Sequence, residues 1–402
     1  MKLAKIATVG FGLALAVGMT ACGSSTPAAT DTSTTTSAPA TTATSDTTTS
    51  APAAATVDYS KDVGIVLSDA SQPRWVMAQA QFQAAMPGVQ IKFSNNDTSV
   101  EKTNVESFIA AGVKVIIINS IDGAAAAAET DEANAAGIPV IAYDRLIMNT
   151  ANVAYYVTFD SVDVGKAQGQ YLADQATASG QKGLNLYLFA GDVGDNNAFL
   201  FFQGAWSVLQ PLIADGTFNV VNSKEATSFA NTATLTHDQE SQIMQPITTL
   251  WDPTKAKTLA EAALAAASPA QKGTVYLLAP NDSTSEAMTD AFRADKAVTT
   301  IFSTGQDLAK ASVQYILDGK QSMTVFKSDK YLVDECVSLV GSIVAGTPAD
   351  PSVITTTYNN GAADIPASAA EITVVTKDNI QQVVTDSGLY TIDANGQVQD
   401  KS

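Results

Sequence analysis

Short apolar segments alternate with helix-like segments along most of the chain, and this alternation limits the possible folds more than any other feature. In the first block, the apolar segments are residues 63–68, 89–94, 113–119 and 138–143. The segment VKVIIIN at 113–119 is apolar at consecutive positions, which is typical of a parallel strand covered on both faces. Strands that alternate with helices form parallel sheets with helices on both faces.

The same alternation returns in a second block. Its predicted strands are 184–190, 218–221, 274–279 and 299–303, and its predicted helices are 196–213, 254–267 and 284–293. Two such blocks predict an α/β protein of two doubly wound parallel-sheet lobes. Of the 402 residues, about 345 remain once an N-terminal region is set aside, which is ample for two lobes of ordinary domain size.

Two sequence signals mark the expected starts of helices in the first block. Ser71 is a candidate cap for a helix over 73–86, in which Pro73 occupies the first turn. Thr98 and Glu101 have the spacing of a capping box before the helix that follows.

Two segments depart from the alternation. Residues 222–250 are polar and irregular, and a structureless loop of that length is uncommon in a compact domain. They predict either an extra short helix or an addition near the cleft. Residues 347–370 are rich in Pro, Ala, Thr and Gly, and a strand at 371–376 and a helix starting near Lys377 follow them. This tail is expected to strap back onto one lobe.

The N-terminal region indicates export and a tether. Residues 1–21 combine two lysines with an uncharged apolar stretch that is too short for a membrane span, as in a signal peptide. The ending MTAC resembles a bacterial lipobox, which predicts lipidation of Cys22; an ordinary signal peptide with an accidental cysteine is the alternative. Residues 22–57 are mainly Ser, Thr, Pro and Ala and predict a flexible, disordered linker.

Composition excludes several classes of function. The net charge of −18 disfavours nucleic acid as a partner, because nucleic-acid binding needs a basic surface. The single histidine, His237, argues against a histidine-rich metal site and against a histidine-based triad. Cys336, which is expected inside a helix, is the one cysteine after Cys22, so the folded part has no internal disulfide. No cofactor is expected.

Polar side chains follow the ends of the predicted strands, where open α/β sheets bind their ligands. The strand IPVIAY runs directly into Asp144 and Arg145, a pair that could not be left unpartnered inside a core. Similar positions elsewhere complete a candidate site of nine residues: Arg74, Trp75, Asp144, Arg145, Asn197, Trp251, Asn281, Asp307 and Lys327.

The chemistry of this set suits a sugar. Carboxylates accept hydrogen bonds from neighbouring hydroxyls, arginine donates through a planar fork, and asparagine does both. The indoles of Trp75 and Trp251 could cover the apolar faces of a pyranose ring.

Each of these residues also has a simpler structural explanation. Asp144 and Arg145 could form a turn salt bridge, Trp75 could be core, and Asn197 and Asp307 could cap helices. A glycosidase pair of Asp144 and Asp307 is conceivable but disfavoured, because each carboxylate has a basic or amide partner in the proposed site. Trp206 is assigned to helix packing.

The segments AYDRLIMNT, YYVTFDSVDVG, GDVGDNNAFLFFQG, GQD and MTVFK together resemble the type I periplasmic sugar-binding proteins of ABC importers. The nearest branch looks like that of the xylose-binding and multiple-monosaccharide-binding proteins, and the resemblance runs from about residue 62 to about residue 390. It implies a non-enzymatic, monomeric protein with the periplasmic binding protein type I fold. Two lobes joined by a three-segment hinge would close on one aldose.

The resemblance also assigns boundaries and roles. The first lobe would span 58–160 plus 328–356, and the second would span 161–327 plus 357–402. Arg74, Trp75, Asp144 and Arg145 would contact the sugar from the first lobe, whereas Asn197, Asn281, Asp307 and Lys327 would contact it from the second lobe or the hinge, and Trp251 would stack on its other face.

An ABC permease in the membrane is the implied partner, and the implied location is outside the cytoplasm, lipid-anchored to the cell membrane. Two other functions stay open: a sugar sensor that presents its bound form to a receptor or kinase, and a binder of a non-aldose polyol or furanose. Thr304, Asn281 and the length of 222–250 depart from the family pattern and leave the identity of the sugar open.

Overall fold

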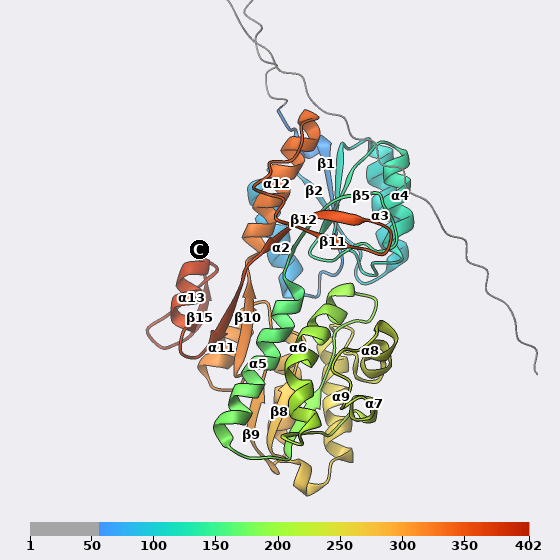
Figure 1. The fold of residues 1–402 in the computed structure, drawn as a ribbon. Helices are drawn as coiled ribbons and strands as arrows, with labels where there is room; N and C mark the ends of the chain where they lie inside the picture. The colour runs from blue at the N-terminus through green and yellow to red at the C-terminus, as the bar shows by residue number, and fades with distance from the viewer. Residues whose placement is uncertain (1–55, 402) are drawn as a thin grey trace, which may run out of the picture. The chain divides into compact units, whose positions relative to one another are not determined.

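The computed structural model describes residues 56–401, and Figure 1 shows their course. The described residues all belong to one compact unit by their contacts. The predicted signal peptide, almost all of the predicted linker and Cys22 lie outside the described residues and remain predictions.

The first lobe is built on a seven-stranded sheet with the order β11-β12-β5-β4-β3-β1-β2. Its strands pair in parallel, except that β11 and β12 are antiparallel. The strands are β1 (Val63–Leu67), β2 (Gln90–Phe93), β3 (Val115–Ile118), β4 (Val140–Tyr143), β5 (Val153–Phe159), β11 (Thr356–Asn359) and β12 (Asp364–Ala370). The helices are α1 (Tyr59–Asp62), α2 (Pro73–Ala85), α3 (Thr98–Ala111), α4 (Ala126–Ala135) and α12 (Asp329–Ala345).

Both faces of this sheet are buried, which explains the uninterrupted apolar runs. Ile117 packs into a cluster under α2 and α12, whereas its neighbours Ile116 and Ile118 pack into a second cluster on the side of α3 and α4. Side chains alternate between the two faces of a strand, so a strand covered on both sides needs apolar residues at every position. Cys336 lies fully buried in α12, as expected.

The second lobe has a four-stranded parallel sheet with the order β7-β6-β8-β9. Its strands are β6 (Leu184–Leu188), β7 (Phe218–Val220), β8 (Gly273–Leu278) and β9 (Val298–Ser303). Its longer helices are α5 (Ser161–Ser179), α6 (Asn196–Ala214), α9 (Pro253–Ala266), α10 (Asp282–Ala294) and α11 (Lys310–Leu317). The predicted α/β class with two parallel sheets is confirmed.

The chain passes between the lobes three times. The passages join β5 to α5, β10 (Met323–Lys327) to α12, and β12 to β13 (Ile372–Thr376). Strands β10 and β13 pair antiparallel beside the second lobe. The chain then ends with α13 (Ile380–Ser387) and the hairpin of β14 (Tyr390–Ile392) and β15 (Val398–Asp400), which pack on α11. Three connecting segments are what the family resemblance implies.

One predicted boundary is wrong. Residues 357–370 were expected in the second lobe, but β11 and β12 extend the first sheet, beside β5 (Figure 1). The composition concealed this strand, because β12 consists mostly of small residues and contains Pro366, which lacks a backbone donor. The pairing of β12 with β5 starts only at Ala367.

The irregular segment 222–250 does contain extra short helices, as one of its two interpretations predicted. They are α7 (Lys224–Ser228), α8 (His237–Met244) and a 3₁₀ turn, η1 (Gln245–Ile247). Trp206 of α6 is buried, and its indole N–H donates to the Thr232 carbonyl at 3.0 Å, so its assignment to helix packing is confirmed.

Both predicted helix caps are wrong. Gln72, not Ser71, precedes α2, and its side chain makes no capping bond. Asp97 caps α3 by accepting hydrogen bonds from the Ser99 and Val100 amides, whereas Glu101 turns inward. Asp97, one position before Thr98, accepts hydrogen bonds from the unpaired amides at the helix start, so Asp97 and not Thr98 is the cap of α3.

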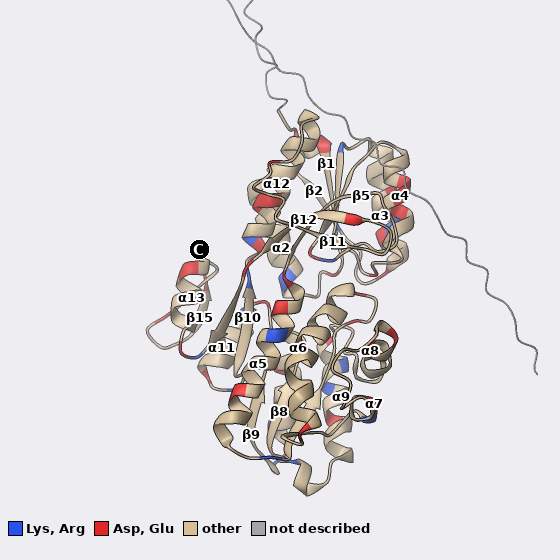
Figure 2. Cartoon of the chain, in the orientation of Figure 1, with Lys and Arg blue, Asp and Glu red and all other residues tan. Residues whose placement is uncertain are grey.

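Charged residues of both signs are interspersed on the helices of both lobes (Figure 2). Several form ion pairs one turn apart, such as Lys330 with Asp334 at 2.6 Å in α12. Such exposed pairs contribute little to stability, about 0–1 kcal/mol each.

Helices α5 and α6 approach each other closely because glycines on each helix pack against the backbone of the other. A Cβ added at Gly204 would lie 2.0 Å from the Val162 carbonyl oxygen, and one added at Gly165 would lie 1.9 Å from the Phe201 carbonyl oxygen. These neighbours are backbone atoms and cannot move aside cheaply. Since α6 begins at the ligand end of the sheet, this contact fixes the direction in which Asn197 projects.

We therefore expect Gly204→Ala to destabilise the protein by about 1–3 kcal/mol through overpacking, although alanine is the better helix former. Gly341 in α12 is the matched control, because a Cβ there meets no atom within 4 Å. Gly341→Ala should raise the free energy of unfolding by about 0.5–1 kcal/mol. Urea unfolding of both variants tests this, and equal shifts of the same sign would contradict it.

Candidate functional site

A cavity lies between the two lobes, with about 380 Å³ of empty space that includes open solvent, and every predicted site residue lines it. The nine residues Arg74, Trp75, Asp144, Arg145, Asn197, Trp251, Asn281, Asp307 and Lys327 all line it. Four further residues complete the lining: Gln72, Asp195, Phe201 and Gln306.

Arg74 is the central cation of the site. It sits in the first turn of α2, and its Nη2 lies 2.7 Å from Asp144 and 2.8 Å from Asp329, while its Nη1 lies 3.4 Å from Asp307 of the second lobe. Burial alone would lower the pKa of Arg74, but these three carboxylates raise it, so the guanidinium stays charged. Burial tends to raise the pKa of Asp144. Arg74, Lys327 and Arg145 outweigh this effect, so the pKa of Asp144 lies below its ordinary value.

Asp144 turns the chain away from β4 into the cavity. Its φ of 64° is left-handed, a conformation that aspartate tolerates better than most residues. Its carbonyl oxygen accepts hydrogen bonds from Tyr156 at 2.8 Å, from Thr158 at 3.0 Å and from Asn197 of the second lobe at 2.8 Å. The buried strand can end on a charged residue because every polar group of that residue is partnered.

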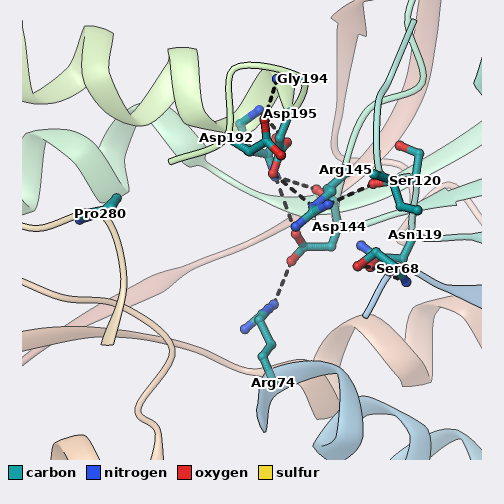
Figure 3. A network of polar contacts seen from close by, with 12 residues as sticks. Ser68, Arg74, Asn119, Ser120, Asp144, Arg145, Asp192, Gly194, Asp195 and Pro280 are labelled. Atoms are coloured by element: carbon teal, nitrogen blue, oxygen red, sulfur yellow. Dashed lines mark hydrogen bonds and ion pairs between the residues drawn. The ribbon is translucent and has the colours of Figure 1, made fainter. Parts of the chain in front are cut away.

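Arg145 points across to the second lobe (Figure 3). Its Nε lies 2.9 Å from Asp195 Oδ2, and its Nη1 donates to the Ser120 carbonyl at 3.0 Å. Asp195 also caps α6, where it accepts from the Asn197 amide. Burial raises the pKa of Asp195 to about 6, although Arg145 opposes that rise.

The second lobe and hinge contribute a wall around Asp307. Its carboxylate lies 3.1 Å from the ammonium of Lys327, which is buried and lies over the rings of Phe159 and Phe201. Asp307 has a φ of 105°, and α11 begins after Ala309, so Asp307 caps no helix. The helix cap offered as a simpler explanation for Asp307 is therefore wrong, and Lys327 is buried.

The two asparagines differ. Asn197 caps nothing, because Asp195 takes that place, and its amide bonds to Asp144 of the first lobe. Asn281 does cap α10, since its side-chain oxygen accepts from the Thr284 amide and hydroxyl. Asn281 thus lines the cavity, but its side-chain oxygen already accepts the hydrogen bonds that cap α10.

Aromatic rings form the apolar part of the lining. The guanidinium groups of Arg74 and Arg145 lie over the ring of Trp75, at 5.1 and 5.4 Å from its centroid. Trp251 meets Phe201 edge to face at 6.3 Å. The indole N–H of Trp251 is buried and makes no hydrogen bond to any residue that the structure describes, so a donor is left for a bound molecule.

Sequence reasoning missed four of the lining residues. Three of them, Gln72, Asp195 and Gln306, lie in the same loops after strands as predicted site residues. The prediction identified these loops as ligand-binding but named only some of their residues. Phe201 lies one helical turn after Asn197 on α6, and the helical spacing of four residues could have revealed it.

The lining charges balance. Arg74, Arg145 and Lys327 face Asp144, Asp195 and Asp307, so the cavity offers charged hydrogen-bonding groups without a net charge of either sign. Among residues 56–401, no cluster of three or more His, Cys, Asp and Glu side chains could hold a metal ion. Over the same residues, no helix is both long and apolar enough to cross a membrane.

The comparisons with known proteins agree with this geometry. A family model described as a periplasmic binding protein domain matches residues 63–348. The chain belongs to the periplasmic binding protein family. The multiple sugar-binding periplasmic receptor ChvE of Rhizobium radiobacter is 33% identical over 342 residues, which cover 82% of this chain and 91% of that protein. The D-xylose-binding periplasmic protein of Haemophilus influenzae is 30% identical over 83% of this chain and 92% of its own length.

A solved structure shows the same fold. The carbohydrate transporter solute-binding protein of Chloroflexus aurantiacus, in complex with D-glucose, is 50% identical and has a TM-score of 0.80, with 84% of this chain and 98% of that chain covered. Together these findings place the protein among the type I periplasmic sugar-binding proteins, in the xylose and multiple-sugar branch. This family is a class of binding proteins and not of enzymes.

In this periplasmic binding protein, two buried glutamates lie behind the Arg145 side of the site. Glu101 of α3 and Glu129 of α4 line one pocket, and Glu101 accepts a hydrogen bond from the Ile121 amide at 2.9 Å. Ser120, which holds Arg145, is the residue before Ile121. Burial and the neighbouring Glu101 carboxyl raise the pKa of Glu129 to about 9, so Glu129 keeps its proton at neutral pH.

Glu129→Gln should therefore make stability less dependent on pH. The pKa of Glu129 is higher in the folded protein, about 9, than its ordinary value of 4.5, so the folded state holds this proton more tightly than the unfolded state. The resulting contribution to stability is complete below pH 4.5 and is lost as the pH rises to about 9. Glutamine needs no proton, so the stability of the variant relative to the wild type should rise steadily between pH 5 and pH 8.

Urea unfolding at several pH values measures this difference. Glu261→Gln, at an exposed position of α9 in the second lobe, is the control and should follow the wild-type pH dependence. Parallel pH profiles for wild type and Glu129→Gln would contradict a protonated Glu129.

Proposed function

We propose that the protein captures one monosaccharide, an aldopentose or aldohexose, between its two lobes and delivers it to an ABC permease. The observation that carries the proposal is the balanced polar cavity between the lobes, which combines planar donors and acceptors with two indoles. A sugar hydroxyl both donates and accepts, so paired carboxylates, guanidinium groups and amides match it well.

The charge balance favours a neutral sugar over a charged one. Each cation of the lining already faces a carboxylate, so a phosphate or carboxylate on the ligand would meet no unmatched positive charge. Burying such an unmatched anion is costly. We expect sugar phosphates and sugar acids to be rejected.

Relatives support aldoses as the class. The Chloroflexus aurantiacus protein was solved with D-glucose, and a solute-binding protein of Clostridium phytofermentans, 31% identical with a TM-score of 0.71, was solved with β-D-glucose. The Haemophilus influenzae relative is named for D-xylose. Among these aldoses we propose D-glucose as the first ligand to test.

Binding would proceed by closure of the hinge. Arg74, Trp75, Asp144 and Arg145 belong to the first lobe, and Asn197, Trp251, Asn281 and Asp307 belong to the second, with Lys327 at the second passage between them. A sugar that contacts both sides stabilises the closed form relative to the open form. The closed form would then dock on the permease.

Sensing is a second candidate function. The Rhizobium radiobacter relative is named a receptor, and the same closed form could be recognised by a membrane sensor. Binding of sugar alone does not separate transport from sensing. Loss of sugar uptake on deletion of the gene supports transport, whereas loss of a sugar-induced response with normal uptake supports sensing.

We further propose that Cys22 is lipidated and holds the protein at the outer face of the cell membrane. In this arrangement, residues 22–57 act as a tether long enough for the folded part to reach a permease. Cys22→Ser should move the protein from the membrane fraction to the soluble exported fraction. Retention of Cys22→Ser in the membrane fraction would contradict the anchor.

Calorimetric titration with D-glucose, D-galactose, D-xylose and L-arabinose tests the binding function, and D-glucose 6-phosphate and myo-inositol serve as comparison ligands. We expect one-to-one binding of one or more aldoses, micromolar or tighter, which corresponds to about −8 kcal/mol. No binding of any aldose by the folded protein would overturn the proposal.

Asp144→Asn is the matched loss-of-function variant, because asparagine also tolerates the left-handed backbone at this position. Loss of a charged hydrogen-bond partner, about 1.5–3 kcal/mol, should weaken binding about 10- to 150-fold. Asp334→Asn, at an exposed position of α12, should leave affinity unchanged. Thermal melting of both variants separates lost binding from lost folding.

A further inference from the structure

Gln72 reaches across the cavity and binds the backbone of the other lobe. It occupies the position before α2 but makes no capping bond there. Its Nε2 instead donates to the Trp251 carbonyl at 2.7 Å, and its Oε1 accepts weakly from the Ser283 hydroxyl at 3.4 Å. Gln72 is buried, so this contact lies out of competition with water.

The Trp251 end of this contact has an unusual backbone. Leu250 and Trp251 both have left-handed φ values, 54° and 58°, which are costly for side chains that are neither Gly, Asn nor Asp. The preceding residues anchor the turn: the Thr248 hydroxyl donates to the Gly191 carbonyl at 2.6 Å, and the Thr249 hydroxyl donates to the Ala190 carbonyl at 2.9 Å.

The turn determines where the indole of Trp251 lies. The ring packs directly on Gly191, where an added Cβ would come within 2.1 Å of it. The Trp251 ring thus packs on Gly191 of the second lobe, while the backbone carbonyl of Trp251 accepts a hydrogen bond from Gln72 of the first lobe. Residues 222–250 lead into this turn, which gives that segment a role in presenting Trp251.

The bond between Gln72 and Trp251 joins two lobes and can exist only when they are closed. Other contacts across the cavity, Arg74 with Asp307 and Arg145 with Asp195, use charged groups that also face the ligand. Gln72, like Asn197, instead donates a neutral amide to a backbone oxygen of the other lobe, and it is the one of the two that holds the Trp251 turn. We propose that Gln72 is an interlobe latch, a positioning residue that stabilises closure by fixing the backbone of Trp251.

This inference rests on the proposed sugar binding, and it concerns how long the sugar stays bound. A contact made only after closure slows dissociation and leaves association unchanged. Loss of one neutral hydrogen bond should therefore raise the dissociation rate of D-glucose about 3- to 10-fold. Stopped-flow tryptophan fluorescence measures both rates.

Three variants and one control test the latch, in protein spanning residues 23–402. Gln72→Ala removes the side chain, Gln72→Asn keeps the amide but shortens its reach, and Gln72→Glu keeps the length but loses the donor. All three should dissociate faster at unchanged melting temperature. Gln90→Ala is the control, because the Gln90 amide also donates to a backbone carbonyl, that of Ser60, but within the first lobe. It should leave both rates unchanged.

A distance measurement separates a latch from a simple sugar contact. Spin labels at the exposed positions Ala84 in α2 and Lys257 in α9 report the separation of the lobes, since buried Cys336 is then the one native cysteine. A latch predicts that Gln72→Ala lowers the closed population both without sugar and at partial saturation with D-glucose. Equal closed populations in wild type and variant, or an effect confined to the association rate, would overturn the latch.

Failure of the latch and failure of the proposed function give different results. If the wild type binds none of the aldoses, sugar binding is overturned, and the ligand-free distances still decide whether Gln72 favours closure. If the wild type binds D-glucose and the Gln72 variants release it at the wild-type rate, the latch is overturned and sugar binding stands.

Discussion

The structure depends on one buried guanidinium. Arg74 brings together carboxylates from three places in the chain: Asp144 after β4, Asp307 after β9 and Asp329 at the start of α12. These carboxylates could not stay ionised side by side in a buried site without a cation, because the cost of burying a charge is regained only by pairing it. The first lobe, the second lobe and the hinge therefore meet at a single side chain.

That arrangement explains why the fold and the site cannot be separated. Arg74 and Asp144 are placed by the first sheet, while the second sheet places Asp195 and Asp307. The charges are complementary only when the two sheets face each other, so closing the lobes pairs groups that would otherwise be hydrated. A neutral ligand with many hydroxyl groups suits such a site, because it adds hydrogen bonds without disturbing the pairing.

Much of this could be predicted from the sequence, for identifiable physical reasons. The run VKVIIIN predicted a strand buried on both faces, and the pair Asp144–Arg145 at a strand end predicted a polar site, because both features would be unfavourable anywhere else. What could not be predicted depended on distant partners. Strand β12 is recognisable only by its pairing with β5, and the inward turn of Glu101 depends on Ile121 and on the Asp97 cap.

The last passage of the chain between the lobes also governs the order in which the protein can fold. Strand β12 belongs to the first sheet and β13 pairs with β10 of the second lobe, and only Glu371 separates them. A chain made from its N-terminus therefore cannot complete either lobe until residues 364–376 have been synthesised. One short segment, residues 364–376, supplies a strand to each lobe, so the completion of one lobe is coupled to the completion of the other.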